Sequence, residues 1–148
     1  MPEKAARAKA VKSLARQRAA QPTLTVRPPA TRSAEAARQF AIDAARLMTD
    51  EKCEDVVVLD LRGVSPVCDF FVIGTGTSDR QMRAVADHVE QLGKSIDDPP
   101  YGVNGLEEGV WIIVDFVDVV VHLFDAERRL YYDLESLWGD GTAVKWEH

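Results

Sequence analysis

Apolar residues in the first part of the folded chain recur at helical spacing. From Ala34 to about Thr49 they return every three or four positions, which places them on one buried face of a helix. Ser33 stands just before this segment, where its hydroxyl can cap the helix. Ser78 and Gln81 form a capping-box pattern before a second such segment, which ends ahead of Pro99. We expect the inner face of this second helix to contain Met82, Val85, Ala86, Val89, Leu92 and Ile96.

Continuous apolar runs predict strands that are buried on both faces. Glu54–Leu61 and Phe70–Gly74 are two such runs. Tyr101–Gly109 is expected to be a loop that contains a short edge strand, and Ala126–Trp138 a short final helix. The sequence therefore predicts a single α/β domain of mixed α+β character. Its mixed sheet should have about five strands and be flanked by helices.

The longest apolar run, VWIIVDFVDVVVHLF at Val110–Phe124, is interrupted by Asp115, Asp118 and His122. A lone membrane helix needs about 20 apolar residues and tolerates central carboxylates poorly. Val and Ile crowd a helix but suit a pleated sheet. We therefore expect two strands joined by a turn at Phe116-Val117, with the two acids framing the turn.

Charge divides the chain near residue 33. The net charge of the whole chain is −6, but residues 1–32 contain eight Lys or Arg and one acid, so they carry +7 and the remainder −13. We expect residues 1–33 to be a flexible, disordered basic extension, residues 34–140 the folded domain, and residues 141–148 a loose C-terminal tail. An arm that contacts a polyanion such as RNA is the functional alternative. The acidic body should be attracted to a basic protein surface and repelled by naked phosphate.

Cysteine and targeting signals are sparse. Cys53 and Cys68 are too few for a disulfide framework, so we expect reduced, partly buried thiols in a cytoplasmic protein. Three scattered histidines do not suggest a metal site, and no cofactor is expected. The N-terminus lacks the apolar stretch of a secretory signal, although its Arg-rich, acid-poor composition is shared with mitochondrial transit peptides.

Two features could support an enzyme. The GTGTS loop at Gly74–Ser78 follows a strand and precedes a helix, where backbone N–H groups can hold a phosphate. It lacks the GxGxxG spacing and the GxxxxGK[ST] lysine, so a tight turn with unusual glycine backbone angles is the favoured interpretation. Asp60, Asp69, Asp115 and Asp118 could be metal-holding carboxylates of a nucleotidyltransferase. The D-x-D pattern is missing, and turn capping or partner binding are the other interpretations of Asp115 and Asp118.

The order of several motifs resembles a known family. DLRGVSPVCDFFVIGTGTSDRQMRAVADHV at Asp60–Val89 is followed by the predicted hairpin and then by RRLYYDLESLWGD at Arg128–Asp140. Over residues 34 to about 140 the chain is similar to the ribosomal silencing factor family, also called the Iojap-related family. The resemblance implies a nucleotidyltransferase-like topology without catalysis. It also implies binding to the large ribosomal subunit, through the fourteenth large-subunit ribosomal protein at the intersubunit face, with joining of the small subunit blocked.

The resemblance also places site residues. Trp111, Asp115, Asp118 and His122 fall in the motif associated with ribosome docking, and Val117 stands where many relatives have Gly, which leaves the turn type open. The residues expected to bind the partner are Trp111, Asp115, Phe116, Asp118, His122, Tyr131, Glu135 and Trp138. Each has a structural alternative: Trp111 in the core, His122 as a hydrogen-bonded interior histidine, and Tyr131 and Trp138 as a seal over the end of the sheet.

The leading hypothesis is a non-enzymatic repressor of translation that acts as a steric plug. Trp111 would anchor it by apolar burial, while Asp115, Asp118 and Glu135 would pair with Lys or Arg of a basic ribosomal protein. The basic arm would add a contact to ribosomal RNA, and no membrane contact is expected. The alternatives are a nucleotide-binding or nucleotidyltransferase-type enzyme that uses the GTGTS loop and the aspartates, and a weak homodimer formed through the hairpin surface.

Overall fold

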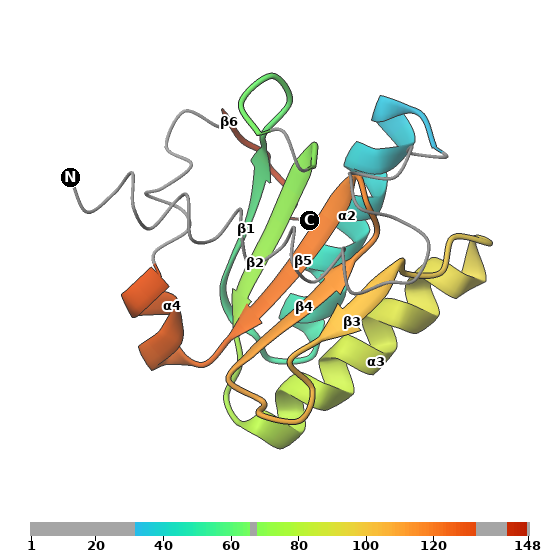
Figure 1. Cartoon of the computed structure of the whole chain (residues 1–148). Coiled ribbons are helices and arrows are strands. Elements are labelled where there is room, and N and C mark those ends of the chain that lie inside the picture. The colour runs from blue at the N-terminus through green and yellow to red at the C-terminus, as the bar shows by residue number, and fades with distance from the viewer. Residues whose placement is uncertain (1–31, 66–67, 133–141, 148) are drawn as a thin grey trace.

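The described part of the chain forms a six-stranded mixed sheet with two long helices packed on one face (Figure 1). The structure is a computed structural model that describes residues 32–65, 68–132 and 142–147. In chain order its elements are α2 (Ala34–Asp50), β1 (Glu54–Asp60), β2 (Phe70–Thr75), α3 (Asp79–Ser95), β3 (Gly102–Asn104), β4 (Trp111–Asp115), β5 (Val119–Phe124), α4 (Ala126–Tyr132) and β6 (Thr142–Ala143). The strand order is β3-β4-β5-β2-β1-β6. Strands β2 and β5 run parallel, and all other neighbours are antiparallel.

The two central strands are buried on both faces. Every residue of β2 and β5 is buried, as their uninterrupted apolar sequences predict. The face toward α2 and α3 forms the main core, which includes Phe70, Val72 and Val121. Side chains of the opposite face form a smaller apolar cluster that includes Phe71 and Ile73. The mixed α/β fold predicted from the sequence is thus confirmed.

Both long helices begin at the predicted caps. The Ser33 hydroxyl accepts a hydrogen bond from the Ala36 N–H (3.1 Å), and the Ser78 hydroxyl accepts one from the Gln81 N–H (3.0 Å). The predicted inner face of α3 is correct for Met82, Val85, Ala86 and Val89, which are buried, and Leu92 is partly buried against the core. It is wrong for Ile96, which is 56% exposed because the helix ends at Ser95.

The segment after residue 141 joins the sheet. Thr142 and Ala143 pair with β1 and supply the sixth strand, where the sequence suggested about five. Val144 and Trp146 pack against the main core, and the Arg46 Nε donates to the Trp146 carbonyl (2.7 Å). The described part of this segment is therefore attached to the fold, which corrects the expectation of a loose tail.

The hairpin between β4 and β5 forms as predicted, but its turn lies one residue later. The Phe116 N–H donates to the Val119 carbonyl (2.9 Å), so Val117 and Asp118 occupy the turn. Val117 has a φ of +79°, the left-handed region that β-branched residues rarely adopt. The Asp115 Oδ1 accepts from the Val117 N–H (2.8 Å) and supports this conformation. Strain of about 1–3 kcal/mol is typical of such a residue.

A partly buried arginine fastens this turn to the rest of the fold. The Arg32 Nε donates to both carboxylate oxygens of Asp118 (3.2 and 3.1 Å), and its Nη2 forms an ion pair with Asp98 (2.8 Å). The guanidinium also lies over the Phe40 ring, 4.3 Å from its centroid. Burial raises the pKa of the Asp118 carboxyl, and Arg32 acts against that shift. The four residues Arg32, Phe40, Asp98 and Asp118 are called the Arg32 cluster below.

Within the described residues, none of the helices combines the length and the apolar character that crossing a membrane requires.

The Arg32 cluster yields a stability prediction. Arg32→Met should lower the free energy of unfolding by about 3 kcal/mol, because it leaves the buried Asp118 without its cation. Adding Asp118→Asn should recover part of that loss, since a neutral amide costs less to bury. Urea denaturation measures both changes. Arg62→Met is the matched control, because the Arg62–Asp60 pair is more exposed and should contribute little to stability. Asp118→Asn is also measured alone. If the stability loss of the double variant equals the sum of the losses of the two single variants, Arg32 and Asp118 are not coupled.

Candidate functional site

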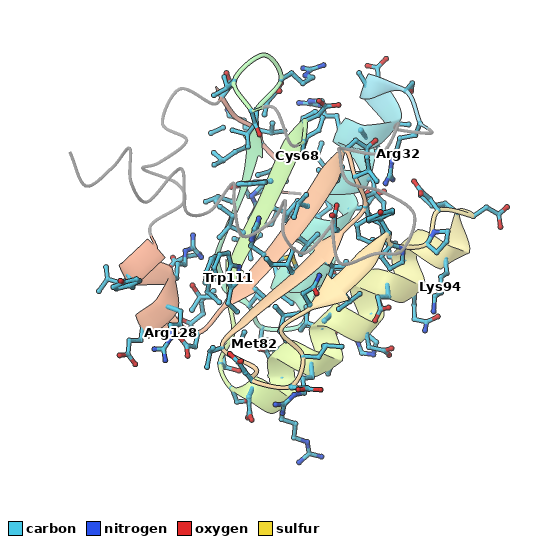
Figure 2. All side chains as sticks on the ribbon, viewed as in Figure 1. Arg32, Cys68, Met82, Lys94, Trp111 and Arg128 are labelled. Atoms are coloured by element: carbon cyan, nitrogen blue, oxygen red, sulfur yellow. The ribbon has the colours of Figure 1, made fainter. Side chains whose placement is uncertain are left out.

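Trp111 lies at the end of the sheet opposite the hairpin turn. It is the first residue of β4 and pairs with Phe124, the last residue of β5. Its indole stacks on the Phe124 ring, with the centroids 4.9 Å apart. Figure 2 shows Trp111 and Arg32 at opposite ends of the sheet. The Trp111 side chain is partly exposed, so part of the indole is packed and part can meet a partner.

His122 holds the indole in place. The Trp111 Nε1–H donates to the His122 Nδ1 (3.0 Å), so the imidazole proton lies on Nε2. His122 is buried and its ring packs edge-on against Phe71, with centroids 4.5 Å apart. Burial lowers the pKa of His122 to about 3, so the ring is neutral at physiological pH. The Nε2 atom has no hydrogen-bond partner in the part of the chain that the structure describes. The interior-histidine alternative is therefore correct for its placement.

The hairpin turn does not present the surface that we expected. Asp115 and Asp118 are each 2% exposed, and Phe116 is 3% exposed. Phe116 packs edge-on against Phe40 in the main core, with ring centroids 4.6 Å apart. Asp115 caps the turn and Asp118 belongs to the Arg32 cluster. This placement argues against partner-binding roles for these three residues, because their side chains are already used inside the fold.

Helix α4 supplies exposed side chains at the Trp111 end. Its first turn is capped by the Asp125 Oδ1, which accepts from the Arg128 N–H (2.7 Å). The Arg129 guanidinium donates to the Thr75 hydroxyl (2.9 Å) and fixes the helix to the end of β2. Tyr131 is 72% exposed, so it does not seal the end of the sheet. Glu135 and Trp138 lie outside the described residues.

The GTGTS loop has few backbone groups left for a phosphate. The Gly76 N–H donates to the Phe124 carbonyl (2.8 Å), and the Thr77 N–H donates to the Gln81 Oε1 (3.1 Å). Its glycines are required by close packing and not by unusual backbone angles. A Cβ on Gly74 would lie 2.6 Å from the Met48 Cε, and one on Gly76 would lie 2.0 Å from the Met82 Cγ.

The aspartates proposed for an enzyme do not form a metal site. Asp60 pairs with Arg62 (2.6 Å), and hydrogen bonds from Arg62 lower the pKa of its carboxyl. In residues 32–65, 68–132 and 142–147 no group of three His, Cys, Asp or Glu side chains could hold a metal ion. Cys53 and Cys68 are buried thiols that form no disulfide, and burial raises the pKa of the Cys53 thiol. The burial of both thiols indicates a structural role for these two cysteines.

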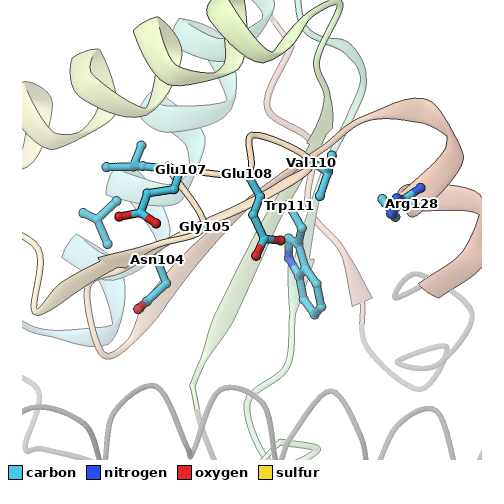
Figure 3. Close-up of a pocket in the computed structure, with 9 residues that line it drawn as sticks. Asn104, Gly105, Glu107, Glu108, Val110, Trp111 and Arg128 are labelled. Atoms are coloured by element: carbon cyan, nitrogen blue, oxygen red, sulfur yellow. The ribbon is translucent and has the colours of Figure 1, made fainter.

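A hollow beside Trp111 was not predicted from the sequence. It has a volume of about 740 Å³ and is lined by β3, the following loop, Trp111 and Arg128 (Figure 3). The loop contributes Leu106, Glu107 and Glu108, all exposed. The sequence feature that could have indicated this hollow is a pair of consecutive acids between Gly105 and Gly109, just before the aromatic strand residue Trp111. The sequence predicts this segment only as a loop that contains a short edge strand.

Comparisons with known proteins agree with the fold. A ribosomal silencing factor of Halalkalibacterium halodurans is 38% identical over 109 residues, which are 74% of this chain and 91% of that protein. A mouse protein named mitochondrial assembly of ribosomal large subunit protein 1 is 34% identical over 104 residues, which are 68% of this chain and 46% of that protein. A crystal structure from Chromobacterium violaceum is 32% identical with a TM-score of 0.66, covering 79% of this chain and 94% of that one.

The family match spans the whole described domain. Residues 34–148 match the family described as ribosomal silencing factor during starvation. The match includes the strands that carry Trp111 and His122 and the loop that lines the hollow. This chain therefore belongs to the ribosomal silencing factor family.

Proposed function

We propose that this protein binds the large ribosomal subunit at the face that meets the small subunit and blocks subunit joining, so that translation is repressed. The observation that carries the proposal is the family match over residues 34–148. The name of the mouse relative, which refers to the large ribosomal subunit, supports the choice of subunit. The action is steric and needs no catalysis, which agrees with the occupied backbone groups of the GTGTS loop.

The partner on the subunit is a basic ribosomal protein, for which we propose the fourteenth large-subunit protein. The support is electrostatic: the chain after residue 32 has a net charge of −13. Such a body is repelled by the RNA backbone and attracted to a basic protein surface. The basic residues 1–32 would add a contact to ribosomal RNA. The place of action is the cytoplasm.

The docking surface lies at the Trp111 end of the sheet and not at the hairpin turn. Trp111 offers a partly exposed indole, and Tyr131 is exposed on the adjacent helix α4. Trp and Tyr are the side chains most often found as anchors of protein interfaces. At the opposite end, Phe116 and Asp118 of the hairpin are buried in or beside the Arg32 cluster. A partner that binds at the Trp111 end can therefore contact the aromatic side chains of Trp111 and Tyr131 without a rearrangement of the fold.

His122 acts through Trp111. Its buried Nδ1 accepts the indole N–H, so the indole is held flat against Phe124 before any partner arrives. Holding an anchor in its bound rotamer removes part of the entropy cost of association. His122 is thus a positioning residue, and its burial leaves no need for a direct contact with the ribosome.

The first prediction concerns the subunit. Added in excess, the purified protein should sediment with separated large subunits and reduce the amount of assembled ribosome in a sucrose gradient. Small subunits alone serve as the control and should not carry the protein. Equal sedimentation with both subunits would refute the proposal, as would an unchanged peak of assembled ribosomes.

The second prediction concerns the anchor. Trp111→Ala should weaken binding to large subunits by about 2 kcal/mol or more, because a partly exposed aromatic anchor is lost. It should also lower the melting temperature, since the indole stacks on Phe124. Trp146→Ala is the matched control: it removes a partly buried indole that packs on the main core. Binding is measured where circular dichroism shows every variant folded. Equal weakening by both substitutions would mean that instability, and not a lost anchor, explains the effect.

The third prediction follows from the pKa of His122, which is about 3 in the folded protein and near 6.5 when unfolded. Between these values the unfolded chain binds a proton that the folded chain does not. Stability should therefore fall as the pH falls from 6.5 toward 3, by up to about 1.4 kcal/mol per pH unit from this group. His122→Gln should remove this component of the slope in urea titrations. Identical slopes for the two proteins would show that His122 is not buried in its neutral form.

A further inference from the structure

The hollow beside Trp111 is open along the edge of the sheet. Strand β3 ends the strand order and pairs with β4 alone, so its outer row of backbone groups has no neighbouring strand among the described residues. Such an edge is a template for another extended chain. Asn104 and Glu107 lie along one wall, Glu108 lies beside the Trp111 indole, and Arg128 faces them from α4 (Figure 3).

The loop that forms the wall is held in one conformation. Gly105 and Gly109 have φ values of +87° and +67°, and a Cβ on Gly105 would lie 2.0 Å from the Trp111 carbonyl oxygen. The Arg83 guanidinium donates to the carbonyls of Leu106 (2.7 Å) and Glu107 (2.9 Å). The loop is thus fixed before binding, which reduces the entropy cost of docking.

The wall carries negative charge that nothing in the described part of the chain neutralises. Glu107 and Glu108 are exposed, and neither carboxylate has an ion-pair partner among the described residues. Arg83 is occupied by the loop carbonyls and by Asp79 (3.1 Å). Arg128, on the opposite wall, pairs with Glu127 (3.3 Å). Two free carboxylates therefore face the hollow.

Apolar side chains lie next to these carboxylates. Leu106 is 38% exposed, and Val110 and Trp111 are partly exposed. Together they provide an apolar strip beside an acidic one. A peptide in extended conformation places alternate side chains on opposite sides, so it can offer apolar groups to one strip and cations to the other.

We infer that the hollow holds an extended basic segment of the protein partner, laid along the outer edge of β3. The inference rests on the proposed function, which supplies a basic ribosomal protein. Lys or Arg side chains would pair with Glu107 and Glu108, and an apolar side chain would contact Leu106 and Trp111. RNA does not fit, because its phosphates would meet the carboxylates. A second copy does not fit either, since two such edges would bring like charges together.

The test reverses the charge of the wall. Glu107→Lys combined with Glu108→Lys should lower the affinity for large subunits about tenfold or more in co-sedimentation, and Glu107→Gln with Glu108→Gln should give a smaller loss. The matched control is Asp50→Lys with Glu147→Lys. These residues are exposed, the second of them beyond β6 at the opposite edge of the sheet, and the net charge changes equally. Melting curves should show all these variants folded, because all four side chains are exposed. An effect of the Glu107/Glu108 reversal no larger than that of the control would overturn the inference.

Hydrogen exchange tests the strand edge itself. In the complex of the full chain with large subunits, the amides of Gly102–Asn104 should exchange more slowly than in the free protein. Unchanged exchange at β3, with binding intact, would overturn placement of the segment along this edge. Failure of the wild-type protein to sediment with large subunits would instead refute the proposed function.

Discussion

Burial of the parallel pair β2 and β5 on both faces is the constraint that organises this protein. No residue of either strand is left at the surface, so burial favours pairing of the polar groups at or beside these strands inside the chain. Asp118 forms an ion pair with Arg32, Asp115 accepts a hydrogen bond from the turn backbone, and His122 accepts one from Trp111. The same constraint separates the two ends of the sheet. One end is closed around a buried ion pair, and the other presents an indole that is only partly packed.

This division explains why the hairpin turn is an unsuitable docking surface. The turn backbone is bound twice by the start of β2, since the N–H groups of Asp69 and Phe70 both donate to the Asp118 carbonyl (2.8 and 2.9 Å). Releasing the Asp118 carboxylate for a partner would break its ion pair with the largely buried Arg32, which is costly. The Trp111 end needs no such rearrangement. Its anchors and its acidic loop are already exposed in the folded chain, so a partner can bind without disturbing the core.

Local sequence signals predicted the parts of the fold that depend on local physics. Ser33 and Ser78 cap their helices because a hydroxyl reaches only the next turn. The strands were recognised because apolar residues filled both faces. The features that the sequence did not predict are contacts between residues that lie far apart in the chain. The Arg32–Asp118 pair spans 86 residues, and nothing near Asp118 shows that its partner lies at the start of α2. The pairing of Thr142 with Asp60 was missed for the same reason.

The candidate site was predicted in part. Of the residues expected to bind the partner, Trp111 and Tyr131 are at least partly exposed, whereas Asp115, Phe116 and Asp118 are buried. An alternating pattern tells which residues share a face, but it does not tell whether that face is covered. Glu107 and Glu108 were overlooked because two acids in a loop carry no periodic signal. Their significance comes from Arg83, which is held by carbonyls, so these carboxylates have no ion-pair partner among the described residues.

The central claim is that the Trp111 end of the sheet, and not the hairpin end, faces the large subunit. Leu106 and Ile96 are exposed apolar residues at these two ends, which makes them a matched pair for photo-cross-linking. A photoreactive residue at Leu106 should form cross-links to a large-subunit protein at the intersubunit face, and one at Ile96 should form none. Cross-links from Ile96 with none from Leu106 would contradict the account.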